Sequence, residues 1–220
     1  MYISVGLSTE KDPNFAAKEA ARIAVNNMRG ERIDLAIAFS SIDLAYPILT
    51  KVLSASLSHV PIIGSSGAAI ISNQGIHKHG LAVMLLSLSS GTYFNTAFVK
   101  DIKAKTSLSA GRELGEKLLS GFKDIRRVIS VTFSDGLMDE GSNFINGLQE
   151  RLGRSFPLAG ASASDNMRFL KTYVYFNQDI FNDSAVLRLA LAHLAVVIEL
   201  NQALDQRLRK IFGQVFQIIG

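Results

Sequence analysis

PIIGSSGAAI at residues 61–70 and PLAGASASDN at residues 157–166 are the two stretches that decide the fold. Both begin with a proline, two apolar residues and a glycine, and both continue with small and hydroxyl residues. The segment LAIAFS at residues 35–40 is likewise followed 94 residues later by ISVTFS at residues 129–134. Because these pairs keep the same order at nearly the same separation, the sequence predicts two copies of one unit packed together.

Each copy shows the same coarse pattern of strand, helix, strand, helix and strand. In the copy of about residues 1–90, strands are expected at 2–6, at 33–39 and up to Gly64, with helices opened by Asp12-Pro13 and spanning 42–57. In the copy of about residues 91–192, strands are expected at 93–100, at 128–133 and up to Gly160, with helices capped by Ser107 or Ser109 and spanning 142–152. Extended closing segments are expected at 82–88, 172–176 and 185–191, with a hairpin turn at 177–179.

The predicted strands are continuous apolar runs rather than alternating ones, which indicates strands covered on both faces. Strands that alternate with helices are typical of an α/β domain with parallel strand pairs, and the closing hairpins add antiparallel strands. The predicted fold class is therefore α/β, with two pseudo-repeated strand–helix–strand–helix–strand units, closing hairpins, and a mixed sheet or sheets flanked by helices.

The composition narrows the classes of protein. The chain has 220 residues, of which 48% are hydrophobic and 19% charged, which is enough for a sizeable core. It contains no cysteine, which excludes disulfides, thiolate nucleophiles and thiolate metal sites. The net charge is +4 and the basic residues are scattered, so no nucleic-acid partner is expected. No signal peptide is visible and the apolar runs at 80–88 and 185–200 are too short to span a bilayer, so we expect no membrane partner and a cytoplasmic location.

Small hydroxyl, carboxylate and glycine residues follow the predicted strands. If these strands are parallel, their carboxyl ends share one rim, where ligands of open α/β sheets bind. Helix N-termini would face the same rim, which suits a small polar ligand with a carboxylate. Taken singly, each of these residues is more simply explained as part of a turn or a helix cap. The predicted ligand-binding residues are Ser40, Ser65, Ser66, Gly67, Ser134, Asp135, Ser162 and Asp165.

Three more specific chemistries fit the sequence poorly. A phosphate-binding loop needs a lysine after its glycines, and GSSGAAI at residues 64–70 has none. A hydrolase elbow needs G-x-S-x-G, and GASAS at residues 160–164 lacks the last glycine. His77 and His79 could face one way on a strand, but no close partners complete a metal site. We therefore predict no enzyme activity, no catalytic residues and no metal site, while a histidine as a haem ligand stays open.

Four stretches together resemble the FIST family (F-box and intracellular signal transduction), and the resemblance covers about residues 1–192. They are VGLSTEKDPNFAAKEA at 5–20, DLAIAFSS at 34–41, PIIGSSGAAIISNQGI at 61–76, and FSDGLMDEGSNFINGLQERLGRSFPLAGASASDN at 133–166. The resemblance implies an amino-terminal FIST region, a ligand-sensing module of signalling proteins that recognises small molecules such as amino acids. Some relatives are haem-based nitric-oxide sensors. The family offers no established catalytic residues to carry over, and its members usually continue into a carboxy-terminal FIST domain.

Residues 193–220 form a separate pattern. Apolar residues recur there at three- and four-residue spacing opposite a polar face, which predicts an amphipathic helix that closes the core or contacts a partner. Three functions therefore stay open: a small-molecule sensor coupled to a signalling output protein, a haem-based gas sensor, and an interaction module that works through residues 193–220. The sequence leaves open whether the protein forms a homo-oligomer.

Overall fold

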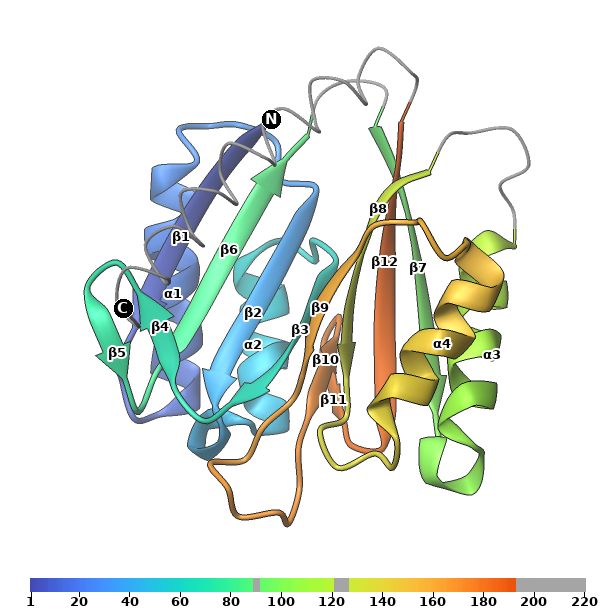
Figure 1. The fold of residues 1–220 in the computed structure, drawn as a ribbon. Helices are drawn as coiled ribbons and strands as arrows, with labels where there is room; N and C mark the ends of the chain where they lie inside the picture. Colours follow the sequence, from blue (N-terminus) through green and yellow to red (C-terminus); the bar gives the residue numbers. More distant parts are fainter. Residues whose placement is uncertain (89–91, 121–126, 193–220) are drawn as a thin grey trace, which may run out of the picture.

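The computed structural model describes residues 1–88, 92–120 and 127–192, and these form a mixed α/β structure (Figure 1). The strands are β1 (Tyr2–Ser8), β2 (Leu35–Ser41), β3 (Ile62–Gly67), β4 (Ile70–Ser72), β5 (Gly75–His77), β6 (Leu81–Ser87), β7 (Thr92–Lys100), β8 (Arg127–Ser134), β9 (Leu158–Ser162), β10 (Val174–Phe176), β11 (Asp179–Phe181) and β12 (Ser184–Ala192). The helices are α1 (Pro13–Asn27), α2 (Pro47–Ser56), α3 (Ser107–Leu119) and α4 (Gly141–Leu152), with short 3₁₀ helices at Ile42–Leu44 and Ile102–Ala104. The predicted α/β class with mixed sheets flanked by helices is confirmed.

The two large sheets share one topology. The first has the strand order β1-β6-β2-β3-β10-β11 and the second the order β7-β12-β8-β9. β6 in the first sheet and β12 in the second are each antiparallel to both of their neighbours. The next pair in each sheet, β2 with β3 and β8 with β9, is parallel. We call β1 to β6 with α1 and α2 the first unit, and β7 to β9 with β12, α3 and α4 the second unit. The hairpin of β10 and β11 lies late in the chain but extends the sheet of the first unit.

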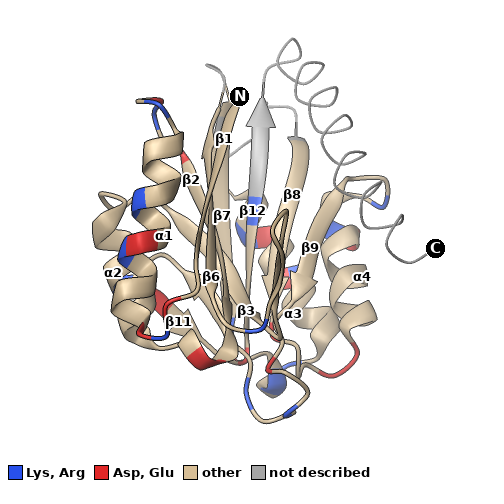
Figure 2. Ribbon diagram, turned by 90° about the vertical axis from the view of Figure 1, so that its left-hand side faces the viewer, with Lys and Arg blue, Asp and Glu red and all other residues tan. Residues whose placement is uncertain are grey.

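The molecule has four layers, with two sheets face to face and two helices on each outer face (Figures 1 and 2). One core cluster fills the space between α1, α2 and the first sheet, and another lies between α3, α4 and the second sheet. A third cluster joins the two sheets and includes Ile37 and Ile63 on one side and Phe133 and Val186 on the other. The central strands of both sheets are therefore covered on both faces, which explains their continuous apolar runs, whereas β9 is largely exposed.

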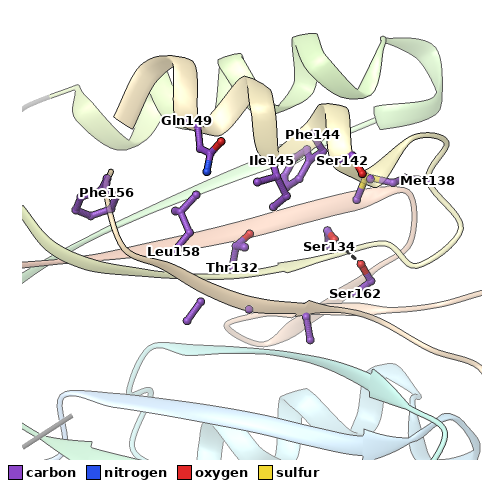
Figure 3. Close-up of a pocket in the computed structure, with 14 residues that line it drawn as sticks. Thr132, Ser134, Met138, Ser142, Phe144, Ile145, Gln149, Phe156, Leu158 and Ser162 are labelled. Atoms are coloured by element: carbon purple, nitrogen blue, oxygen red, sulfur yellow. Dashed lines mark hydrogen bonds between the residues drawn. The ribbon is translucent and has the colours of Figure 1, made fainter. Parts of the chain in front are cut away.

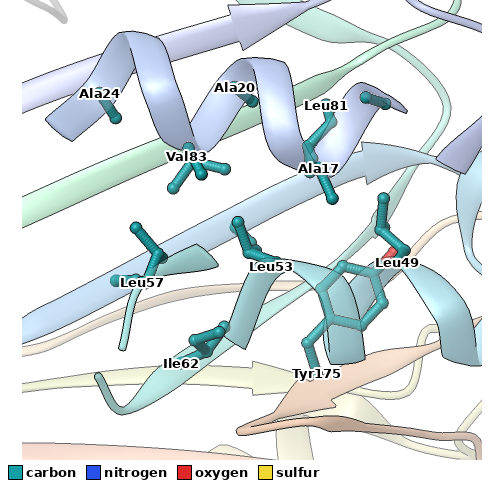
Figure 4. Packing of buried hydrophobic residues seen from close by; sticks show 14 of the residues in the cluster. Ala17, Ala20, Ala24, Leu49, Leu53, Leu57, Ile62, Leu81, Val83 and Tyr175 are labelled. Atoms are coloured by element: carbon teal, nitrogen blue, oxygen red, sulfur yellow. The ribbon is translucent and has the colours of Figure 1, made fainter. Parts of the chain in front are cut away.

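Alanines form the inner face of α1. Ala17, Ala20 and Ala24 are buried against the first sheet beside Val83 and α2 (Figure 4). The small side chains let the helix lie very close to β1, where a Cβ on Gly6 would stand 2.0 Å from the carbonyl oxygen of Ala20. Dispersion attraction in this layer therefore comes from close backbone approach as well as from large side chains.

The helix starts follow from capping chemistry. Asp12 accepts hydrogen bonds from the amides of Asn14 and Phe15, as its place before Pro13 predicts. The prediction that Ser107 or Ser109 caps α3 is wrong, because Thr106 holds the cap position and accepts from the amide of Ser109. Where several hydroxyl residues are adjacent, a predicted helix start is commonly wrong by one or two residues.

Two other boundaries differ from prediction. The helix expected at residues 42–57 is divided into a 3₁₀ helix and α2, because Pro47 has no amide hydrogen to donate and starts a new helix instead. The third strands run on past Gly64 and Gly160, so Ser65, Ser66 and Gly67 lie within β3 rather than after it. The predicted hairpin turn is confirmed, since β10 and β11 pair antiparallel around residues 177–178.

The predicted amphipathic segment 193–220 lies outside the described residues. Of the helices in the described part of the chain, none combines the length and the apolar character that crossing a bilayer requires.

Candidate functional site

The predicted ligand-binding residues gather at the carboxyl ends of the two parallel strand pairs. Ser40 lies opposite Ser66 in the register of β2 and β3, and Ser134 lies opposite Ser162 in the register of β8 and β9. The two units meet here, because the hydroxyl of Ser66 donates to the carbonyl of Ser164 at 2.9 Å. The strand ends of both units therefore lie at one end of the molecule, as the rim prediction requires.

In the first unit, buried side chains fill the space at the ends of β2 and β3. Ser40, Ser65 and Ser66 are buried, and Gly67 is half-buried at the end of β3. The hydroxyl oxygens of Ser40 and Tyr175 lie 2.6 Å apart, and Tyr175 is fully buried between the sheet and α2. Burial raises the pKa of the Tyr175 phenol, and the hydrogen bond with Ser40 offsets this only in part.

The two predicted aspartates both organise turns. The buried carboxylate of Asp135 accepts from the amide of Leu137 and from the hydroxyl of Thr172, each at 2.7 Å. The carboxylate of Asp165 accepts from four consecutive amides, those of residues 168–171. Burial raises the pKa of Asp165, and the four amides together outweigh burial and hold it below the ordinary value. These bonds give both residues a structural role, and their predicted role toward a ligand stays a prediction.

In the second unit, the space that corresponds to the site of the Tyr175 ring is not filled by a described side chain. A pocket of about 680 Å³ lies between α4 and the end strand of the sheet (Figure 3). Ser134 and Ser162 stand at one end of the pocket, with their hydroxyl oxygens 3.3 Å apart. Ser142, in the first turn of α4, completes this polar end, and no side chain caps the helix there.

The rest of the pocket is mainly apolar. Its walls are formed by Phe144 and Ile145 of α4, by Leu158 of β9 and by Phe156, with Gln149 as the polar group toward the far end (Figure 3). Among residues 1–88, 92–120 and 127–192, no lysine, arginine, aspartate or glutamate lines the pocket. The lining therefore combines a hydroxyl-rich end with an apolar channel, the usual composition of a small-molecule site.

Sequence reasoning found two residues of this pocket, Ser134 and Ser162, and missed its apolar walls. Phe144, Ile145 and Leu158 follow the same helix and strand periodicity as core residues, so no sequence signal separates a wall from a core. One sequence comparison points to a wall residue. When α4 and α2 are aligned on Leu148 and Leu53, Ile145 stands at the position of Thr50 in the first unit.

The three described histidines lie away from the pocket, and each has a hydrogen-bonding partner. His59 is bonded to Ser54, His77 to Ser72, and His79 to the carbonyl of Glu10. Within residues 1–88, 92–120 and 127–192 no cluster of three or more potential metal ligands occurs. His193 lies outside the described residues, and the haem alternative stays a prediction.

One buried cation lies in the second sheet. Arg188 on β12 is buried with its guanidinium carbon 4.3 Å from the centre of the Phe94 ring, and its Nε has no hydrogen-bond partner among the described residues. Burial lowers the pKa of Arg188 to about 10, although the charge of Asp34 acts in the opposite direction. Arg188 does not line the α4 pocket, so the two features are separate.

The fold and the pocket define a mixed α/β domain with a cavity of the size that binds small molecules. The FIST N domain model matches residues 34–218, and the chain therefore belongs to this family of sensory domains in signal transduction. Among solved structures, the cyanuric acid hydrolase from A. caulinodans has a TM-score of 0.41 and 7% identity, with 87% of this chain and 71% of that chain covered. A search of curated proteins finds no match.

Proposed function

We propose that this chain is the sensory domain of a signalling system and that it binds a small carboxylate, such as an amino acid, in the α4 pocket. The observation that carries the proposal is the pocket itself, in which two hydroxyls at the strand ends face an uncapped helix start. Family membership supplies the sensory role, and the pocket supplies a place for the ligand.

The polar end of the pocket suits a carboxylate. The amide of Asn143 donates to the carbonyl of Glu140, whereas those of Gly141 and Ser142 have no acceptor among the described residues. The helix dipole favours negative charge at this end. The hydroxyls of Ser134, Ser162 and Ser142 add donors that adjust by rotation. The described lining residues carry no charge, so the carboxylate would be held by hydrogen bonds and by the helix start rather than by a counter-ion.

The apolar channel suits the rest of such a ligand. Ile145, Leu158 and Phe156 border the space that leads away from the serines (Figure 3). An apolar side chain of the ligand would gain free energy by leaving water there, at about 25 cal/mol for each Å² that it buries. The output would follow from a population shift, since a ligand that prefers one packing of the two units against each other changes a contact elsewhere in the protein.

Thermal unfolding in the presence of amino acids and other small carboxylates tests the proposal. A ligand at 100 times its dissociation constant should stabilise the protein by about 2.7 kcal/mol and raise the melting temperature accordingly. Ile145→Trp should reduce the effect, because the larger side chain occupies the pocket from an exposed position on α4. The matched control is Ile48→Trp, an exposed isoleucine on α2 that does not line the pocket.

The proposal fails if no carboxylate at millimolar concentration changes the melting temperature. It also fails if a stabilising ligand acts equally on the wild type and on Ile145→Trp, because binding would then take place elsewhere.

A further inference from the structure

The two units differ at one place. In the first sheet the strand pair β2 and β3 continues into β10 and β11, whereas β9 is the last strand of the second sheet within the described residues. We propose that the free edge of β9 binds an extended segment of a partner protein, antiparallel to β9, with a tyrosine whose ring enters the α4 pocket and whose hydroxyl bonds to Ser134.

The first unit shows what the complete arrangement looks like. Tyr175 on β10 lies opposite Gly64 in the antiparallel register with β3. The amide of Ser66 donates to the carbonyl of Tyr173 at 2.9 Å, and the amide of Asn177 donates to the carbonyl of Ile62 at 2.8 Å. Tyr173 and Asn177, which flank β10, therefore bond to the outer edge of β3, while the phenol of Tyr175 fills the space beneath α2.

The glycine and serine of this arrangement have counterparts in the second unit. Gly64 pairs with Ala38 in β2, and Gly160 pairs with Thr132 in β8. A Cβ at either glycine would lie within about 2 Å of the partner's carbonyl oxygen, at 1.8 Å for Gly64 and 2.0 Å for Gly160. Two residues further on, Ser40 faces Ser66 and Ser134 faces Ser162. The glycine opposite Tyr175 and the serine that its hydroxyl meets thus have counterparts, Gly160 and Ser134, which line the α4 pocket.

The helices correspond as well. Leu49 and Leu53 of α2 and Phe144 and Leu148 of α4 are buried against their sheets at the same spacing. Thr50, next to Leu49, is buried and donates to the carbonyl of Gln178 in the β10–β11 turn at 2.8 Å.

The equivalent of Thr50 in α4 is Ile145, which is 36% exposed and lines the open pocket. Ile145 therefore stands at the position that contacts the hairpin in the first unit, on a surface that no described element covers.

The edge of β9 itself is exposed. Residues 159–162 are all solvent-exposed, whereas residues 62–66 of β3 are all buried. By the register of the first unit, the outward-facing groups are the amides of Gly160 and Ser162 and the carbonyls of Leu158 and Gly160. An unprotected strand edge is a template for pairing with another chain, and short apolar strands add to such edges in many complexes.

The chemistry of the pocket specifies the side chain that enters it. A ring over Gly160 would contact Phe144 and Ile145, and a hydroxyl at its far end would reach the Ser134–Ser162 pair, as Tyr175 reaches Ser40. Phenylalanine fills the same volume but leaves these hydroxyls without the added partner, so the site discriminates in favour of tyrosine. The partner segment therefore has the pattern apolar–Tyr–apolar in an extended conformation.

The test uses a peptide of residues 171–179 of this chain, KTYVYFNQD, because it contains the strand that fills the equivalent site. It is added to the full-length protein labelled with nitrogen-15, and the backbone amides are followed by NMR at peptide concentrations up to the millimolar range. We expect shifts and slower hydrogen exchange at Gly160 and Ser162, with the Ser66 amide of the first unit unchanged.

A double-mutant cycle identifies the hydroxyl contact. Ser134→Ala in the protein and Tyr175→Phe in the peptide should each weaken binding about fivefold, the loss of one buried hydrogen bond. Combined, they should weaken it no more than either change alone, because both remove the same bond. Ser56→Ala, an exposed serine on α2, is the matched control and should leave binding unchanged.

Four results would overturn the proposal. They are no change at the β9 amides, changes confined to Ser66 and β3, full additivity in the cycle, or slow exchange of Gly160 and Ser162 before peptide is added. The last would show that the edge already has an occupant. A free carboxylate and the partner tyrosine would compete for the same pocket. Stabilisation by a free carboxylate is measured without the peptide, so failure of the sensing function is distinguished from failure of peptide binding.

Discussion

At the scale of single residues, the same serine has two different surroundings in the two units. Ser40 is fully buried, 2.6 Å from the phenol oxygen of Tyr175, and it also donates to the carbonyl of Ser41 at 2.9 Å. Ser134 occupies the matching register position but faces the pocket, with Ser162 at 3.3 Å. The hydroxyl that supports the core in one unit is therefore free to meet a ligand in the other.

Removing these hydroxyls should have unequal effects on stability. Ser40→Ala leaves the buried phenol of Tyr175 without a partner and should cost about 1–3 kcal/mol. Ser134→Ala should cost less, about 0.5–1 kcal/mol, because it removes one long hydrogen bond and Ser162, which keeps its hydroxyl, is exposed to water. Chemical denaturation of both variants measures the difference. Equal losses would contradict the assignment of a structural role to Ser40 and an open one to Ser134.

Asp165 should make folding sensitive to acid. Its pKa is held below the ordinary value by four amides, so its contribution is complete above about pH 4 and is lost as the pH falls through the lowered value. Asp165→Asn should reduce the free energy of unfolding at pH 7 by about 2 kcal/mol, since asparagine keeps one acceptor oxygen and its NH2 group cannot accept the other two amides. The unfolding curves of the wild type and the variant should converge as the pH is lowered. A constant difference between them would show that the carboxylate charge is not what stabilises the turn.

At the scale of elements, α3 and α4 are held unusually close by glycines. A Cβ on Gly111 would lie 2.2 Å from the carbonyl oxygen of Phe144, and one on Gly147 would lie 2.2 Å from that of Leu108. The two helices therefore contact each other through backbone atoms. This contact fixes α4 over the second sheet, so it also fixes one wall of the pocket.

Gly147→Ala should destabilise the protein by about 1–3 kcal/mol, even though alanine favours a helix more than glycine does, because the methyl group forces the helices apart. Gly141→Ala is the control, since a Cβ at the start of α4 meets no atom within 4 Å. Thermal unfolding should show a loss for the first variant only. A neutral or stabilising effect of Gly147→Ala would contradict the close backbone contact.

The sequence predicted the existence of these elements better than their limits. Continuous apolar runs located β2 and β8, and Asp12-Pro13 located the start of α1, because burial and capping leave local patterns. Thr106 was missed as the cap of α3 because several hydroxyl residues lie next to each other there. The break before α2 was missed because a long apolar pattern runs through Pro47, where the helix starts anew. The pocket walls were missed because an apolar side chain at helical spacing is identical in sequence whether it meets a core or a cavity.

At the scale of the whole molecule, two units share the order of four strands and pack sheet against sheet. Within the described residues, β3 is paired on its outer edge by β10, whereas β9 has no strand on its outer edge. The repeated sequences at residues 61–70 and 157–166 correspond to β3 and β9, the two strands that differ in this respect. The repeated copies stay a prediction from the sequence, and the difference between the outer edges of β3 and β9 was not predicted. It depends on the hairpin of β10 and β11, which follows β9 along the chain and yet pairs with β3.

Hydrogen exchange at two amides tests this asymmetry most directly. The amide of Ser66 donates to the carbonyl of Tyr173 across the covered edge, and the amide of Ser162 is its counterpart on the open edge. We predict that Ser66 exchanges only through large-scale unfolding, whereas Ser162 exchanges orders of magnitude faster. Equal protection of the two amides would show that both edges are covered, and it would contradict an open site in the second unit.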